Sequence, residues 1–173
     1  SEDLDLVVVK DGEASYFWTY CAEGIRQVLL AHTLIVPESV SRIPNGDVIE
    51  GKCIGIVGCG SLGSKIAAML VRSGVRRFIL VDDDVLLPGN LERNELGGTA
   101  VGVHKVEALS ARLSDIAGEL DVTARCVALG GQESADSTQS VMLALSGCDA
   151  IVDATADPQC FNFCAAVART TLT

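Results

Sequence analysis

A short apolar run that leads directly into a glycine-rich turn constrains this chain more than any other feature. Residues 53–57 (Cys-Ile-Gly-Ile-Val) predict a strand buried on both faces. Gly58, Gly60 and Gly63 follow in a G-x-G-x-x-G pattern, with Ser61 between them, at the start of an expected helix. The first glycine permits a tight turn, the second lets backbone N–H groups approach a phosphate, and the third allows close helix–strand packing. The pattern predicts an α/β fold that binds a phosphate at a helix N-terminus.

Strand-like and helix-like apolar segments alternate through the rest of the chain. Such alternation implies right-handed crossovers and a Rossmann-like, doubly wound, mainly parallel sheet with helices on both faces. We expect residues 51–173 to form this nucleotide-binding domain, truncated at its C-terminal side. After the first strand, the expected segments are a helix at 62–70, a strand at 78–81, a helix at 106–120, strands at 122–129 and 150–152, and a helix at 161–169.

The first fifty residues differ in character from the rest. Residues 4–9 and 15–20 predict two strands joined by a turn, and residues 25–34 predict a short helix. Residues 37–46 are rich in proline and polar side chains, as is typical of a linker. We therefore interpret residues 1–50 as an N-terminal segment or linker, a remnant of or a connection to a preceding module.

The composition restricts the partners that this chain can bind. It carries 13 Lys and Arg against 23 Asp and Glu, a net charge of −10. Since surfaces that follow a polyanion need clustered basic residues, we expect no nucleic-acid binding, although one nucleotide in a local pocket is compatible with this charge. The apolar runs, such as 66–71, are too short to span a membrane. Seven cysteines without a signal peptide indicate reduced thiols, so we expect a cytoplasmic protein that binds no membrane.

Three acidic residues end the second strand of the expected sheet. Asp82 lies nineteen residues after Gly63 and is followed by Asp83 and Asp84. An acidic side chain at this spacing accepts hydrogen bonds from ribose hydroxyls, and Asp82 is the best placed of the three. This feature alone leaves NAD and ATP as alternatives.

The next loop separates these two ligands. Asn90, Arg93 and, twelve residues later, Lys105 follow at the edge of the sheet where doubly wound folds bind ligands. Two fixed cations and an amide beside a phosphate-binding turn suit a triphosphate, whereas a nicotinamide cofactor has no obvious need for both cations. Asp153 and Asp157 follow the last strand, and one of them could hold Mg²⁺ through oxygen ligands.

The cysteines have a structural interpretation. Cys53, Cys59, Cys126 and Cys148 lie in or beside expected core strands, so we predict that they pack in the core. Cys160 and Cys164 fall on one helical face, and the sequence holds no C-x-x-C pair that would suggest zinc.

Taken together, these motifs resemble the ThiF/MoeB/HesA family, the adenylation domains of ubiquitin-activating enzymes and their bacterial relatives. The resemblance covers about residues 51–165, and the combination of motifs is specific although each alone is not. It implies an enzyme that uses MgATP to activate the C-terminal carboxylate of a ubiquitin-like, β-grasp protein. The products are an acyl adenylate and pyrophosphate, and transfer to a cysteine often follows.

Carried over residue by residue, the resemblance assigns the site. It implies phosphate contacts for the Gly58–Gly63 turn, ribose binding for Asp82, triphosphate contacts for Asn90, Arg93 and Lys105, and Mg²⁺ binding for Asp157. Arg93 and Lys105 are the expected catalytic residues, and Ser61 and Asp84 complete the expected cofactor-binding set.

The chain also departs from the family pattern. The spacing from Arg93 to Lys105 is one residue shorter than we expect, and the Asp153–Asp157 segment carries one extra residue, which leaves Asp153 as the second metal candidate. Family members are often homodimers in which a partner's N-terminal Arg enters the site, and Arg26 is the local candidate for that role. We expect the transfer cysteine to lie beyond residue 173.

Two other functions remain as alternatives. One is an NAD(P)-dependent oxidoreductase with a Rossmann domain, which the cations at Arg93 and Lys105 disfavour. The other is a non-catalytic partner subunit of the same fold, which the presence of both cations also disfavours.

Overall fold

The structure, a computed structural model, describes residues 5–11, 13–22, 25–30, 46–131 and 133–171. The chain divides into two compact units, Ser1–Arg42 and Ile43–Thr173. Residues 37–45 of the expected linker lie outside the described residues. The assignment of nucleotide binding to residues 51–173 stays a prediction.

The first unit is a three-stranded antiparallel sheet in the order β1-β2-β3. The two strands expected at 4–9 and 15–20 correspond to β1 (Asp5–Asp11) and β2 (Glu13–Ala22). The helix expected at 25–34 is wrong, because β3 (Ile25–Leu30) is a strand that pairs with β2 from Ala22↔Ile25 to Phe17↔Leu30. Periodicity cannot separate a helix from a strand in so short an apolar run, and backbone pairing with the neighbouring strand decides the outcome.

The second unit is built on a four-stranded parallel sheet, as the alternating pattern predicts. Its order is β6-β5-β4-β7. β5 and then β6 are added on one side of β4, and the chain then crosses back to place β7 on the other side of β4. This reversal between β4 and β7 is a topological switch point, where doubly wound folds bind their ligands. The strands are β4 (Cys53–Val57), β5 (Arg77–Val81), β6 (Asp121–Arg125) and β7 (Ala150–Asp153).

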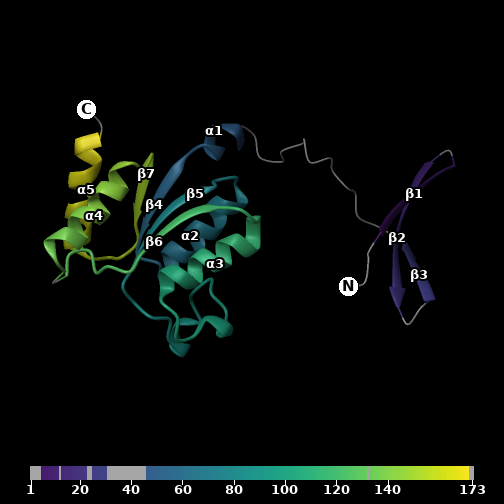
Figure 1. Ribbon diagram of the computed structural model, residues 1–173, viewed down its shortest axis with the longest axis horizontal. Helices are drawn as coiled ribbons and strands as arrows, with labels where there is room; N and C mark the ends of the chain where they lie inside the picture. The colour runs from purple at the N-terminus through teal and green to yellow at the C-terminus, as the bar shows by residue number, and fades with distance from the viewer. Residues whose placement is uncertain (1–4, 12, 23–24, 31–45, 132, 172–173) are drawn as a thin grey trace. The chain divides into compact units, whose positions relative to one another are not determined.

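Helices cover both faces of this sheet, with α2 and α3 on one side and α4 and α5 on the other (Figure 1). The five-residue helix α1 leads into β4. The helices are α1 (Gly46–Glu50), α2 (Ser61–Arg72), α3 (Lys105–Ala117), α4 (Ala135–Ser146) and α5 (Pro158–Thr171). Two one-turn 3₁₀ helices, Pro88–Asn90 and Gly98–Ala100, lie in the segment between β5 and α3.

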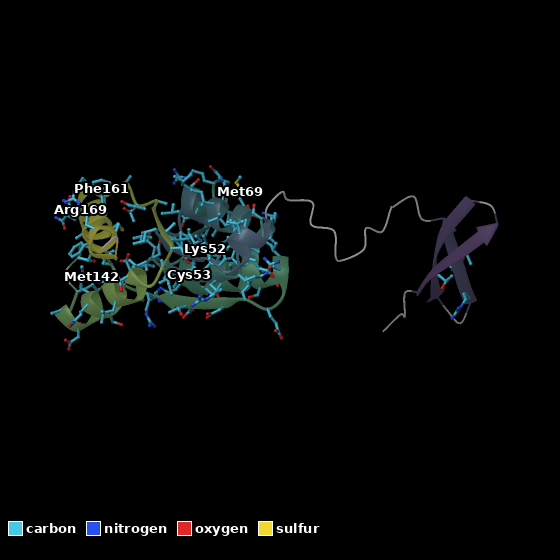
Figure 2. The ribbon with its side chains drawn as sticks, turned by 90° about the horizontal axis from the view of Figure 1, so that it is seen from above. Lys52, Cys53, Met69, Met142, Phe161 and Arg169 are labelled. Carbon is cyan, nitrogen blue, oxygen red and sulfur yellow. The ribbon has the colours of Figure 1, made fainter. Side chains whose placement is uncertain are left out.

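The alternation of side chains along β4 divides the core into two layers. Ile54 and Ile56 pack with α2 and α3, whereas Val57 packs with α4 and α5. Every residue of β4 is buried, which is why its sequence is a continuous apolar run. In Figure 2, Met142 on α4 and Phe161 on α5 both lie at the α4–α5 end of this unit, away from Met69 on α2.

Element ends differ from expectation where local turns intervene. The third strand of the sheet stops at Arg125 rather than 129, because its pairing with β5 ends at Val81↔Arg125. The chain then turns at 128–131, where Gly131 N donates to Ala128 O at 2.9 Å. Helix α3 stops at Ala117 because Gly118 adopts a φ of 74° and its N–H donates to Ser114 O at 2.8 Å. Helix α4 was not expected from the sequence, as only Val141 and Leu145 of its residues are buried. In the described part of the chain, no helix has the length and apolarity needed to cross a membrane.

Candidate functional site

A cavity of about 370 Å³ opens at the carboxyl ends of the parallel strands, beside the switch point between β4 and β7. Six of the residues selected from the sequence line it: Gly58, Gly60, Asp82, Asp84, Lys105 and Asp157. The fold therefore brings together segments separated by about a hundred residues of chain. Sequence reasoning missed the segment 127–131 and Thr155, which also line the cavity. The carboxyl-end position of the 127–131 loop after β6 was the available signal.

The three glycines of the turn have different surroundings. Gly58 adopts a φ of 88°, and a Cβ there would lie 3.0 Å from backbone and side-chain atoms of Ala154 and Thr155. A Cβ on Gly63 would lie 1.9 Å from the carbonyl oxygen of Gly58, so only glycine lets α2 begin so close to the turn. A Cβ on Gly60 would meet nothing within 4 Å, since this residue faces the open cavity. The second glycine thus leaves room for a ligand, as the motif predicts.

Helix α2 presents its N-terminus to the same space. Its N-cap is Gly60, and no side chain caps its first turn. The unpaired N–H groups of a first turn and the helix dipole favour an anion. This end of α2 can therefore bind a phosphate group through main-chain donors.

Asp82 joins the end of β5 to the glycine-rich turn. Its Oδ2 accepts from Cys59 N at 2.6 Å and its Oδ1 from Asp84 N at 2.8 Å. Burial raises the pKa of Asp82, and the hydrogen bonds from the Asp84 and Cys59 amides lower it in part. The carboxylate is held in a fixed orientation on the cavity wall, where its remaining lone pairs can accept from ligand hydroxyls.

Lys105 is a buried cation. Only 7% of the residue is exposed, and its Nζ lies 2.5 Å from Asp84 Oδ2, whose side chain is 65% exposed. The sequence pattern alone did not indicate this burial. The β5–α3 connection folds back on itself, with Lys105 N donating to Asp84 O at 2.9 Å, so the start of α3 lies beneath the Asp84 loop.

A second, smaller cavity of about 100 Å³ adjoins the first and shares Gly60 and Lys105 with it. Its lining includes Ser61, Asn90 and Arg93, and Arg93 is exposed. The three residues that sequence analysis placed around a triphosphate, Asn90, Arg93 and Lys105, therefore share one small space. Lys105 contributes to both cavities.

The loop that carries Arg93 is held by its own side chains. Asn90 Oδ1 accepts from Leu87 N at 3.0 Å and closes the 3₁₀ turn. Asn94, which sequence analysis did not select, donates from Nδ2 to Cys59 O at 3.3 Å and lines the smaller cavity. Its position directly after Arg93 was the only local signal, because its partner lies 35 residues away.

The two metal candidates after β7 have different environments. Asp153 Oδ1 accepts from both the amide and the hydroxyl of Thr155, at 3.0 and 2.7 Å, and so stabilises the turn. Asp157 is exposed and lines the larger cavity, and its Oδ1 accepts from Gln159 N at 2.8 Å at the start of α5. Between them Ala156 adopts a φ of 60°, a left-handed conformation uncommon outside glycine.

Asp157 has the ligand chemistry that Mg²⁺ requires, since a carboxylate oxygen at the cavity wall is a hard donor. Asp82, Asp83 and Asp84 also bring carboxylate oxygens within 4.8 Å of one another. Two of these three already have partners, as Asp82 accepts from backbone amides and Asp84 pairs with Lys105. Asp157 Oδ1 likewise accepts from Gln159 N, so existing partners do not separate Asp157 from this acidic triad, and its assignment to the metal stays a prediction.

The cysteines agree only in part with the packing prediction. Cys53, Cys59, Cys160 and Cys164 are buried, and Cys148 is half-buried with its Sγ 3.8 Å from that of Cys53. The prediction for Cys126 is wrong, because this residue is exposed, with its Sγ 3.2 Å from His104 Nδ1. β6 ends one residue earlier, at Arg125, so Cys126 lies outside the strand, and no residue of β6 is itself buried.

Comparison with known proteins places these features in context. A model of the ThiF family matches residues 44–166. The chain is 46% identical over 68 residues to uncharacterized protein y4qC of Sinorhizobium fredii, covering 39% of this chain and 12% of that protein. It is 35% identical over 104 residues to the ATP-dependent ubiquitin transferase-like protein Cap2 of Pseudomonas aeruginosa, covering 52% of this chain and 19% of that protein.

A solved structure shares the fold. Escherichia coli tRNA N6-threonylcarbamoyladenosine dehydratase, TcdA, in complex with ATP matches with a TM-score of 0.63 and 24% identity, covering 73% of this chain and 50% of that chain. At this identity the likeness concerns the fold alone. The present chain spans less than a fifth of the length of the two curated relatives.

Proposed function

Because this chain belongs to the ThiF family, and because its glycine-rich turn, Lys105 and Arg93 converge on adjoining cavities, we propose that it is the nucleotide-binding part of an ATP-dependent adenylyltransferase. Its substrate is the C-terminal carboxylate of a ubiquitin-like protein, and its products are an acyl adenylate and pyrophosphate. Arg93 and Lys105 are the proposed catalytic residues. We propose that the enzyme acts in the cytoplasm.

One observation carries the proposal, namely the pair of cavities that share Gly60 and Lys105. The larger one suits a nucleoside, with Asp82 on the ribose, and the smaller one suits the terminal phosphates. The turn that contains Gly58 and Gly60 would contact the phosphate that joins the nucleoside to the terminal phosphates. A dinucleotide such as NAD has no phosphate to occupy a site with two cations beyond the glycine-rich turn, so this arrangement supports ATP over NAD.

The chemistry of adenylation fits these side chains. A carboxylate oxygen of the substrate bonds to the α-phosphorus, the bond to pyrophosphate breaks, and negative charge builds on the phosphate oxygens in the transition state. Arg93 offers a planar fork of N–H donors and Lys105 a compact positive charge to these oxygens. When bound, Mg²⁺ neutralises further triphosphate charge, and Asp157 is the residue that we assign to hold it.

The nature of the carboxylate substrate rests on the relatives. Cap2 is named as a ubiquitin transferase-like protein, which supports a ubiquitin-like partner. TcdA is named as a tRNA N6-threonylcarbamoyladenosine dehydratase, which makes a modified nucleoside within a tRNA the second candidate substrate. The net charge of −10 favours the protein substrate, because a tRNA needs a basic surface. We further propose a homodimer in which Arg26, exposed on β3, supplies a cation to the partner's site.

Calorimetry with MgATP and with NAD tests the ligand. We expect saturable binding of MgATP and none of NAD. Tight binding of NAD without ATP binding would contradict the proposal and favour an oxidoreductase. Binding of ATP without any ATP–pyrophosphate exchange by the complete enzyme would favour a non-catalytic subunit.

Substitution of the two cations tests their role. In the complete enzyme, Arg93→Ala and Lys105→Met should each lower ATP–pyrophosphate exchange by about 10²–10³-fold. The methionine retains the apolar stem of the buried Lys105, so thermal unfolding should change little. Lys52→Met is the matched control, since Lys52 pairs with Asp149 at 2.8 Å at the opposite end of β4. Near-normal exchange in both variants would show that the triphosphate binds elsewhere.

A further prediction concerns thioester formation. Transfer needs an accessible thiolate, and Cys53, Cys59, Cys160 and Cys164 are buried. Cys148 is half-buried, and burial raises the pKa of its thiol to about 12. Cys126 is exposed, but desolvation and the neighbouring Asp83 raise the pKa of its thiol. Residues 1–173 incubated with ATP and ubiquitin-like proteins should therefore give no dithiothreitol-sensitive conjugate on a non-reducing gel. A conjugate that maps to Cys126 would show that this unit carries its own acceptor.

A further inference from the structure

The carbonyl oxygen of Arg93 receives two donors from helix α2. Ser61 Oγ donates to it at 2.9 Å, and Lys65 Nζ donates to the same oxygen. Residues 61 and 65 are four apart, so their side chains lie on one face of α2, one turn from each other. The lysine contact is charge-assisted, which makes it stronger than an ordinary hydrogen bond to a carbonyl.

One further hydrogen bond holds the main chain near Arg93 against the same helix, because Glu95 N donates to Ser64 Oγ at 3.2 Å. Within the loop itself, Arg93 N donates to Asn90 O at 3.1 Å. Three side chains of the first two turns of α2, those of Ser61, Ser64 and Lys65, therefore fix the position of residues 93–95.

The position of this backbone governs where the Arg93 guanidinium can reach. The Arg93 side chain is long and exposed, so its own packing does not fix it. A displacement of about 1 Å in a group that stabilises a transition state can cost about 10²-fold in rate. Contacts that fix the Arg93 peptide thus bear directly on the reaction.

We propose that Lys65 is a positioning residue, which acts on the reaction through the peptide of Arg93 and not on the phosphates. This inference rests on the proposed function for its catalytic part. Within the described residues, the smaller cavity is lined by Ser61 and Arg93 but not by Lys65, which supports an indirect role. Ser61 has a second role in this arrangement. It lies in the proposed phosphate-binding turn, and its hydroxyl also donates a hydrogen bond to the Arg93 carbonyl oxygen.

Hydrogen–deuterium exchange tests the contact without any assumption about activity. In Lys65→Met, the amides of residues 91–96 should exchange about tenfold faster than in the wild type, because the loop opens more often. Lys65→Arg should restore protection, and Lys52→Met should exchange like the wild type. Equal exchange in Lys65→Met and the wild type would overturn the proposal.

Kinetics of the complete enzyme test whether Lys65 acts on the reaction through Arg93. Lys65→Met should lower kcat for ATP–pyrophosphate exchange by about tenfold with little change in the KM for ATP, and Lys65→Arg should recover most of it. In an Arg93→Ala background, Lys65→Met should have no further effect, since the residue that it positions is gone. Multiplicative losses in the double variant would instead show that Lys65 contacts the phosphates and would overturn the indirect role.

The two measurements separate failure of this inference from failure of the proposed function. A wild-type enzyme without pyrophosphate exchange would refute the adenylation proposal and with it the catalytic part of the inference. The exchange rates of residues 91–96 would still decide whether Lys65 holds the loop.

Discussion

Gly60 and Gly63 are three residues apart in the same turn, but a methyl group added to each would meet different surroundings. At Gly63 it would lie 1.9 Å from the Gly58 carbonyl oxygen, whereas at Gly60 it would lie in open space. Gly63→Ala should therefore lower the free energy of unfolding by at least about 2 kcal/mol, because backbone must move. Gly60→Ala should fold normally and lose MgATP affinity, since its methyl enters the phosphate space.

Chemical denaturation and calorimetry on the two variants check this difference. Similar denaturation midpoints for Gly63→Ala and the wild type would contradict the close approach of α2 to the turn. Unchanged MgATP affinity in Gly60→Ala would contradict the position of the phosphates.

At the scale of elements, helix α4 begins with a defined cap. Ser134 Oγ accepts from Ser137 N at 3.1 Å, which satisfies one N–H group of the first turn. Ser134→Ala should lower the free energy of unfolding by about 1 kcal/mol. Ser140→Ala is the matched control, as Ser140 is exposed within the same helix and its loss should change stability by less than about 0.5 kcal/mol. Equal denaturation midpoints for the two variants would show that the cap contributes nothing.

At the scale of the whole second unit, Ile43–Thr173, the cysteines couple stability to pH. Burial raises the pKa of Cys164 to about 11 and that of Cys148 to about 12, from an ordinary value of 9.0. Between pH 9.0 and the raised pKa values of about 11 and about 12, the unfolded chain loses thiol protons that the folded chain keeps. The contribution of the protonated thiols to the stability of the fold is therefore fully present below about pH 9 and is lost as pH rises through the folded-state pKa values.

Thermal unfolding at several pH values tests this coupling. The midpoint should fall by several degrees between about pH 8 and pH 10.5. Because other groups also titrate there, the comparison is with Cys164→Ala, whose midpoint should fall less steeply over the same range. Parallel curves for the two proteins would contradict the raised pKa of Cys164.

Local signals in the sequence were sufficient for several elements of the site. The apolar run of β4, the three glycines and the amphipathic α2 are contiguous, so their geometry follows from steric rules that act over a few residues. Asp82 follows β5 directly, and a parallel sheet places all its carboxyl ends at one edge. The alternation of strands and helices likewise predicted the parallel sheet with helices on both faces.

Other features depended on contacts between distant segments. The run at 25–30 became a strand because β2 pairs with it, and Cys126 lies outside the sheet because the pairing of β6 with β5 ends at Arg125. Helix α4 was not predicted from the sequence, because its few buried residues give a weak apolar pattern.

The sequence by itself determined the α/β fold, the turn that can hold a phosphate and the cations near it, because each depends on residue type and spacing over short stretches. Only the tertiary structure decided that Lys105 is buried against Asp84 and that Lys65 contacts the Arg93 carbonyl, 28 residues away. The orientation and burial of a long charged side chain depend on which segments pack around it, and no local pattern encodes that packing.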